Sequence, residues 1–260
     1  MLNTTASYQL IARDMTRSLS RTANSPVVAR ETEYYLANIT KVQSIEDFLG
    51  NDRVFAYAMK AFGLEEMTYA KAFMRKALEG GIDDDQSFAN KLSDRRYREF
   101  VEAFNFVRYG EAATAFDRTQ QGTVDLYLRQ TLEITAGDRN QGVRLALYFE
   151  RKAPEIGSVY QILADPALLQ VVQTALGIPA STGAANIDVQ AKMISARLDV
   201  GDLKDPEALG KFLERFTSLW ELGHPSAAAL SPAMLVSQPI EAGIGPDLLM
   251  ALQGLKIGGL

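Results

Sequence analysis

Hydrophobic residues recur every three or four positions along most of the chain. Tyr8, Ile11 and Met15 fall on one helical face together with Leu19, and the same rhythm continues through residues 69–77. No stretch alternates apolar and polar residues convincingly, as a half-buried strand does. The pattern predicts an all-α protein built as a multi-helix bundle.

A segment near the N-terminus resembles another segment 114 positions later. Residues 30–64 align with residues 144–178 without a gap, and the similar positions are mostly apolar or helix-ending residues. Identical residues stand at Arg30/Arg144, Tyr34/Tyr148, Ser44/Ser158, Leu49/Leu163, Ala61/Ala175 and Gly63/Gly177. Such self-similarity at a fixed spacing is typical of a repeated supersecondary unit. We therefore predict a duplicated bundle of two pseudo-repeats.

The aligned segments carry matching signals for the start and the end of a helix. Asn51 and Asp165 are good N-cap residues, and each precedes an apolar-rich run of about three turns. These runs stop at Gly63 and Gly177, where the left-handed backbone that often ends a helix favours glycine. A helix is predicted in each copy between these two signals.

The run GVRLALYFERKAPEIGS, residues 142–158, gathers arginines, a lysine and aromatic residues, and so raises the question of an active site. Its helical spacing places Tyr148 and Phe149 on an inward face and leaves Arg151 and Lys152 outside. We interpret the run as a packing helix of the duplicated scaffold, and we expect both cations to lie in water.

Glycines and prolines divide the chain into unit one (residues 1–112), unit two (113–222) and an Ala/Pro/Ser-rich segment with a short C-terminal helix (223–260). Residues 223–240 contain no Asp, Glu, Lys or Arg. A charge-free stretch with large apolar residues either packs on its own body or meets a partner, and both alternatives stay open. The candidate partner-binding residues of this tail are Met234, Leu235, Val236, Leu248, Leu249 and Leu252.

Composition narrows the chemistry that the chain can perform. A net charge of -5, from 27 basic and 32 acidic residues, gives no general attraction for a polyanion, so no nucleic-acid partner is expected. Cysteine is absent and the single histidine, His224, precedes a proline, which argues against thiolate catalysis, a serine triad and most metal sites. We expect no cofactor, no metal and no catalytic residue.

The run GVRLALYFERKAPEIGSVYQILADPALLQVVQTALGIP, residues 142–179, resembles the bacterial family named domain of unknown function 1217, and the likeness extends over both repeats. Genes of that family in alphaproteobacteria tend to lie among flagellar genes. By association, the resemblance implies a role in building or running the flagellum, with a flagellar or export-apparatus protein as partner. The family has no established catalytic residues to carry over.

No apolar run reaches the roughly 20 residues that cross a bilayer, and the N-terminus lacks the pattern of a secretion signal. We therefore expect no membrane insertion. The chain is expected to stay in the cytoplasm, or to leave through the flagellar apparatus without a cleaved signal peptide.

Two functions fit these observations. The first is a non-enzymatic interaction protein that assists flagellar assembly, export or function. The alternative is a ligand-binding sensor or an enzyme whose site lies in the groove between the two helical units, since bundle grooves can hold ligands.

Overall fold

The computed structural model describes residues 3–224, and all regular structure in that range is helical. The α-helices are α1 (Thr4–Ala12), α2 (Met15–Ala23), α3 (Pro26–Ile39), α4 (Ile45–Gly50), α5 (Asp52–Ala61), α6 (Lys71–Gly80), α7 (Arg95–Ala103), α8 (Phe106–Tyr109), α9 (Gln121–Gly137), α10 (Gln141–Lys152), α11 (Val159–Ala164), α12 (Pro166–Leu176), α13 (Ile187–Ser195) and α14 (Pro206–Gly223). The 3-10 helices are η1 (Glu65–Met67), η2 (Ala89–Lys91), η3 (Gly110–Ala115), η4 (Asp117–Thr119), η5 (Ala153–Glu155), η6 (Ala180–Ala184) and η7 (Val200–Lys204). The all-α prediction is confirmed.

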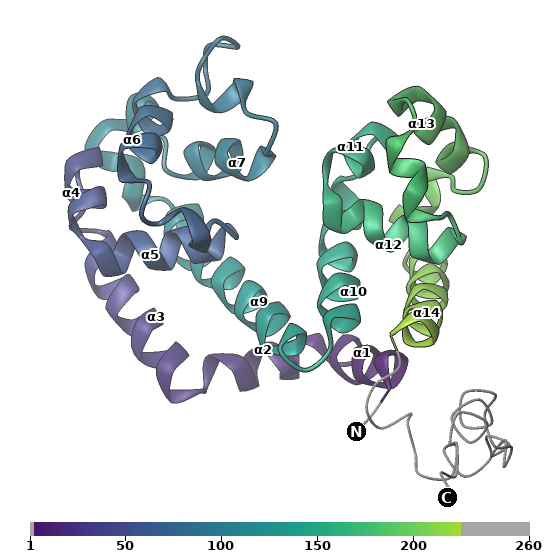
Figure 1. Ribbon diagram of the computed structural model, residues 1–260. Helices are drawn as coiled ribbons and strands as arrows, with labels where there is room; N and C mark the ends of the chain where they lie inside the picture. Colours follow the sequence, from purple (N-terminus) through teal and green to yellow (C-terminus); the bar gives the residue numbers. More distant parts are fainter. Residues whose placement is uncertain (1–2, 225–260) are drawn as a thin grey trace, which may run out of the picture.

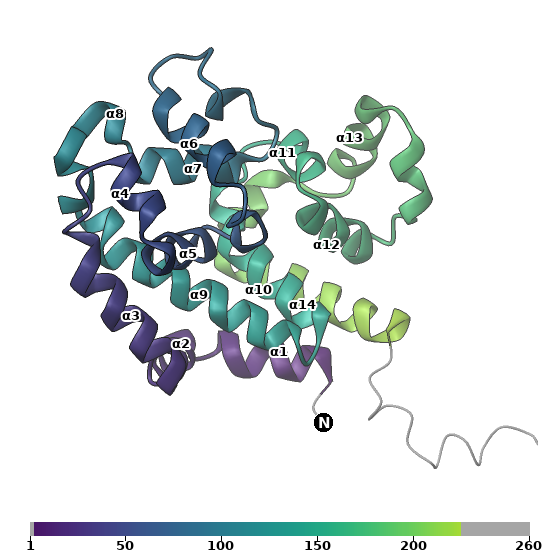
Figure 2. The ribbon, with the colours of Figure 1, turned by 60° about the vertical axis from the view of Figure 1, so that its left-hand side comes forward.

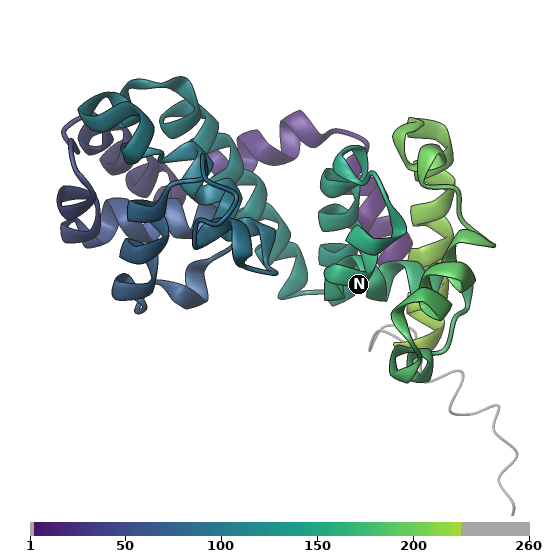
Figure 3. The same cartoon turned by 90° about the horizontal axis from the view of Figure 1, so that it is seen from above.

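The helices form two groups that stand side by side. Figure 1 shows α3 to α7 in one group and α10 to α14 in the other, with α9 leading from the first to the second. The view from above separates the same two groups (Figure 3). Each group encloses its own cluster of buried apolar side chains, called here the first core and the second core.

The first core extends from Val28 on α3 to Tyr127 on α9 and is rich in aromatic rings. Three tyrosines form a stack, in which the Tyr57 ring lies 4.3 Å from that of Tyr35 and 3.8 Å from that of Tyr127. The hydroxyl of buried Tyr35 donates a hydrogen bond to the Thr119 carbonyl at 2.5 Å. Because Tyr127 belongs to α9, this stack fixes the first half of that helix to the first core.

The second core contains buried apolar residues between Val143 and Trp220, and it also contains Tyr8 from the other end of the described chain. Trp220, the single tryptophan of the sequence, is 5% exposed and packs near Phe216, as its helical spacing predicts. Its ring lies so close to Gly142 on α10 that a Cβ atom there would stand 2.3 Å from Trp220 Cδ1. Only glycine permits this approach of α10 to α14.

The first two helices, α1 and α2, form an N-terminal arm (residues 4–23) along the base of both groups (Figure 1). Helix α1 contacts α10 and α14, whereas α2 contacts α9. The Thr4 backbone N–H donates to the Glu221 carboxylate at 2.9 Å, and Asn140 Nδ2 donates to Thr4 Oγ1 at 2.8 Å. Figure 2 shows α1 lying beside the helices of the second core. The start of predicted unit one therefore packs on the helices of predicted unit two.

The packing thus divides the described chain differently from the predicted units, whose boundary lies between residues 112 and 113. The first core continues past that boundary to residue 127, and the second core includes residue 8. The sequence units stay a prediction, whereas the two cores describe how the helices pack.

Helix boundaries recur at the offset of 114 residues found in the sequence. Helices α3, α4 and α5 correspond in this way to α10, α11 and α12. Asn51 and Asp165 cap α5 and α12 through their side chains, and Gly63 and Gly177 follow with φ of 71° and 63°. The predicted helix starts and stops are confirmed in both copies. The duplication of the chain stays a prediction.

Candidate functional site

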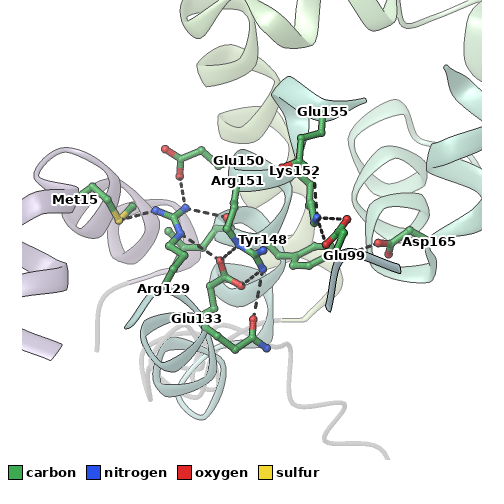
Figure 4. A network of polar contacts seen from close by, with 12 residues as sticks. Met15, Glu99, Arg129, Glu133, Tyr148, Glu150, Arg151, Lys152, Glu155 and Asp165 are labelled. Atoms are coloured by element: carbon green, nitrogen blue, oxygen red, sulfur yellow. Dashed lines mark hydrogen bonds and ion pairs between the residues drawn. The ribbon is translucent and has the colours of Figure 1, made fainter. Parts of the chain in front are cut away.

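A cluster of paired charges lies where α9 and α10 run side by side (Figure 4). Its centre is Glu133 on α9, whose side chain is 2% exposed. The carboxylate accepts hydrogen bonds from Arg129 Nε at 3.2 Å and from Arg151 Nε and Nη2 at 2.7 and 2.9 Å. A carboxylate this deeply buried is tolerated because two guanidinium groups neutralise it and satisfy its oxygens.

Arg129 joins this cluster to the N-terminal arm. Its Nη1 contacts the sulfur of Met15 at the start of α2, and its Nη2 donates to the Leu147 carbonyl at 3.0 Å. The same guanidinium lies 3.6 Å from the Glu150 carboxylate. One side chain on α9 therefore touches both α2 and α10.

The electrostatics of the cluster follow from burial and pairing. Burial alone lowers the pKa of the Arg151 guanidinium, but Glu133 overrides this effect and the pKa is raised. The carboxyl of Glu150 has a raised pKa, mainly because it is buried, although Arg129 and Tyr8 oppose the increase. Oxygen Oε2 of Glu150 is buried and accepts no hydrogen bond. Glu150 is therefore the least satisfied acid of the cluster.

A second set of ion pairs extends from α10 to the first core. Lys152 Nζ donates to the Glu99 carboxylate on α7 at 3.1 and 3.2 Å, and to Glu155 at 3.0 Å. The Lys152 and Arg151 side chains are only 15% and 22% exposed. The prediction that both cations lie in water is wrong, because acidic partners from α7 and α9 meet them on the outer face of α10.

The aromatic part of the same run packs as expected. Phe149 is fully buried, and Tyr148 is half-buried, with its hydroxyl donating to the Asp165 carboxylate at 2.6 Å. Burial, together with this hydrogen bond to an anion, raises the pKa of Tyr148. Asp165 also accepts from two backbone N–H groups at the start of α12. The run therefore serves packing and interhelical pairing.

The chemistry available to this cluster is limited by its pairing. Each buried cation contacts a carboxylate, and Glu133 accepts bonds at both oxygens, so these groups chiefly hold one another in place. In the described range of residues 3–224, no group of His, Cys, Asp and Glu is arranged to hold a metal ion. Among the described helices, none is long and apolar enough to cross a membrane.

A surface groove lies between α11 and α13 of the second core. Its volume is about 410 Å³, and its lining includes Ser158, Tyr160, Asp188, Lys192 and Ser195. The Tyr160 hydroxyl donates to the Asp188 carboxylate at 2.9 Å, which links α11 to α13. Tyr160 remains 52% exposed.

Helix α13 also carries two exposed apolar residues, which flank the face that lines this groove. Ile187 is 52% exposed and Val189 is 48% exposed, and both neighbour the lining residue Asp188 in sequence. Tyr160 is therefore the large accessible side chain that lines the groove itself, whereas Ile187 and Val189 lie on its two flanks. We call this region the α11–α13 groove.

The predicted partner-binding residues of the tail lie outside the described residues, which end at residue 224. These are Met234, Leu235, Val236, Leu248, Leu249 and Leu252. Sequence reasoning also missed the charged cluster around Glu133. The four-residue spacing of Arg129 and Glu133 on one helix was the available sign, since such pairs face each other.

The comparisons with known proteins agree with this fold. The family described as "Protein of unknown function (DUF1217)" matches residues 61–209, more than half of the chain. The chain belongs to this family. A crystal structure of a protein from Agrobacterium tumefaciens, 51% identical in sequence, superposes on the DUF1217 chain with a TM-score of 0.78. The match covers 85% of this chain and 94% of that protein. No curated protein matches the chain.

The residues that match the family model include most of the features described above for this DUF1217 protein. They include α9 to α13, and thereby the cluster around Glu133 and the α11–α13 groove. Helices α1 to α4, which include the N-terminal arm, precede the matched residues.

Proposed function

We propose that this DUF1217 protein is a non-enzymatic interaction protein that assists flagellar assembly, export or function. The structural support for this proposal is the α11–α13 groove. Accessible aromatic and aliphatic side chains beside a polar rim are characteristic of protein contact sites. The flagellar setting comes from the family resemblance. The partner is accordingly a component of the flagellum or of its export apparatus.

The mutual pairing of the interior charges supports the same proposal. A catalytic acid or base needs a proton-transfer group within reach of a substrate, whereas Glu133 and Arg151 are engaged with each other. Their arrangement is that of a structural ion-pair cluster, which holds α9 against α10. This supports a scaffold that acts through its surface.

The test begins with an in-frame deletion in the native host, scored by swimming and by electron microscopy of flagella. The deletion strain then receives the wild-type gene, the Ile187→Asp/Val189→Asp variant or a Tyr69→Asp control. Tyr69 is 81% exposed on the segment before α6, so the control also places a charge at an exposed apolar site. We expect the wild type and the control to restore swimming, and the groove variant to fail.

Two results would oppose the proposal. Normal swimming of the deletion strain would remove the flagellar role. If the groove variant restores swimming, and is present at wild-type levels with an equal melting temperature, the groove is not the contact site.

The ligand-binding alternative has its own observation, because a volume of about 410 Å³ falls within the range of small-molecule sites. This groove lies on the second core and not between the two predicted units. A thermal-shift screen of metabolites tests this alternative, since a ligand that binds the folded state raises the melting temperature by mass action. Stabilisation that Tyr160→Ala abolishes would favour it over the interaction proposal.

A further inference from the structure

The N-terminal region differs from the rest of the chain in charge. Residues 1–30 contain Arg13, Arg17, Arg21 and Arg30 but a single acid, Asp14, which gives a net charge of +3. The remaining residues carry 23 basic and 31 acidic side chains, a net charge of -8. A positive arm therefore accompanies a negative body.

Helix α2 presents these arginines on its outward face. Arg17 and Arg21 are four residues apart, so they lie one turn apart on the same side of the helix, about 6 Å along its axis. Arg13 stands at the bend just before α2, and all three side chains are exposed. Half-buried Met15 and Leu19 occupy the side of α2 that faces α9 and the body.

The arginines of this face are unpaired, unlike many others on the surface. In the part of the chain that the structure describes, none of the three forms an ion pair with a carboxylate. Asp14, the nearest acid in sequence, instead accepts from the Arg17 backbone N–H and caps α2. Four exposed arginines of the first group of helices do have acidic partners, in the pairs Arg53–Glu31, Arg75–Glu46, Arg96–Asp94 and Arg108–Asp83.

We propose that the outward face of α2, with Arg13, Arg17 and Arg21, docks an acidic helical segment of a partner protein, one that carries carboxylates at four-residue spacing. The proposal rests on the function proposed above, in that it describes a contact surface of an interaction protein. Charge complementarity supplies the attraction and selects a partner with matching spacing.

Two other anionic partners fit this surface less well. Membrane-surface helices bury an apolar face in the lipid, whereas the apolar side of α2 is turned towards α9. Nucleic acid presents a long polyanion, which the body with its net charge of -8 repels. A short acidic protein segment touches the arm and avoids the body.

The experiment uses the full chain and a labelled synthetic helical peptide with Glu at positions i, i+4 and i+8, measured by fluorescence anisotropy. The same peptide with Gln at those positions is the probe control. The variants are Arg17→Glu/Arg21→Glu and, as a matched charge change on α7, Arg95→Glu/Arg98→Glu, whose arginines are also exposed. Binding is measured in about 0.05 M and about 0.5 M NaCl.

We expect the wild type and the α7 variant to bind the Glu peptide, and the α2 variant to bind it about 10-fold or more weakly. The Gln peptide should bind weakly to every protein, and high salt should weaken binding of the Glu peptide. Absence of wild-type binding, or equal losses in both variants, would overturn the proposal. So would tighter binding of duplex DNA or phosphatidylserine vesicles than of the Glu peptide through the same arginines.

The outcome can be separated from the test of the proposed function. If the deletion strain is non-motile but the purified wild-type protein does not bind the Glu peptide, the flagellar role is retained and the docking face is excluded. If the deletion strain swims normally but the purified protein binds the Glu peptide through α2, the docking face is retained and the flagellar role is excluded.

Discussion

Replacing Glu133 by Gln tests whether the buried ion-pair cluster stabilises the protein. The substitution keeps the size of the side chain but removes the charge between Arg129 and Arg151. The new amide also directs N–H groups towards guanidinium groups that can only donate. Two cations with exposures of 14% and 22% then share the interior without their central anion.

The magnitude follows from burial. Removing one member of a buried ion pair costs about 3–5 kcal/mol, because the remaining charge is left uncompensated. Arg129 keeps Glu150 at 3.6 Å and the Leu147 carbonyl at 3.0 Å, which places the expected loss at the lower end, about 3 kcal/mol. For a chain of this size that loss lowers the melting temperature by about 6–12 °C.

The assay is urea and thermal unfolding, followed by the fluorescence of Trp220 and by far-UV circular dichroism. Trp220 reports on the second core alone, whereas circular dichroism follows the helices of both cores. Glu207→Gln is the matched control, since Glu207 is 80% exposed in its pair with Lys211 and its loss should stay within about 0.5 kcal/mol. A Glu133→Gln loss below about 1 kcal/mol would refute the structural role given to the cluster.

Three further outcomes are expected. Gly142→Ala forces the Trp220 ring to move and should destabilise the protein by about 1–3 kcal/mol, with a changed near-UV spectrum; unchanged stability and spectrum would contradict the close approach. Burial raises the pKa of Glu150, so the folded wild type loses stability as the pH rises above the range in which an unfolded glutamate ionises. The unfolding free energy of Glu150→Gln should therefore rise relative to that of the wild type between about pH 4 and pH 7. A constant difference between the two proteins over this range would oppose this expectation. Asp165→Ala removes the N-cap of α12 and the hydrogen-bond acceptor of Tyr148, so the free energy of unfolding in urea should fall by about 1–2 kcal/mol. An unchanged free energy of unfolding would show that the cap does not stabilise the protein.

Local patterns in the sequence predicted what depends on local physics. The sequence predicted the N-caps at Asn51 and Asp165, because the side chain of a cap bonds a backbone N–H within three residues. It also predicted the helix ends at Gly63 and Gly177, because a left-handed φ depends on the residue at one position. Likewise, Trp220 and Phe216 stand four residues apart, so helical spacing alone places their rings on one face.

The interhelical pairing of charges could not be predicted in this manner. Periodicity places Lys152 on the outer face of α10, but it carries no information about Glu99, 53 residues away in sequence. Likewise nothing near residue 8 indicates that Tyr8 packs with residues of α14. The α11–α13 groove depends on the relative placement of two helices, which spacing within either helix leaves undetermined.

The attachment of α1 to the second core has a consequence for synthesis of the chain. The first core is complete once Tyr127 has left the ribosome, and a contiguous segment can fold there early. Tyr8 emerges before all of that segment, yet its neighbours on α14 arrive about 200 residues later. The apolar side of α1 therefore lacks its native partners until α10 and then α14 have been made, which leaves this helix open to a chaperone while the first core folds.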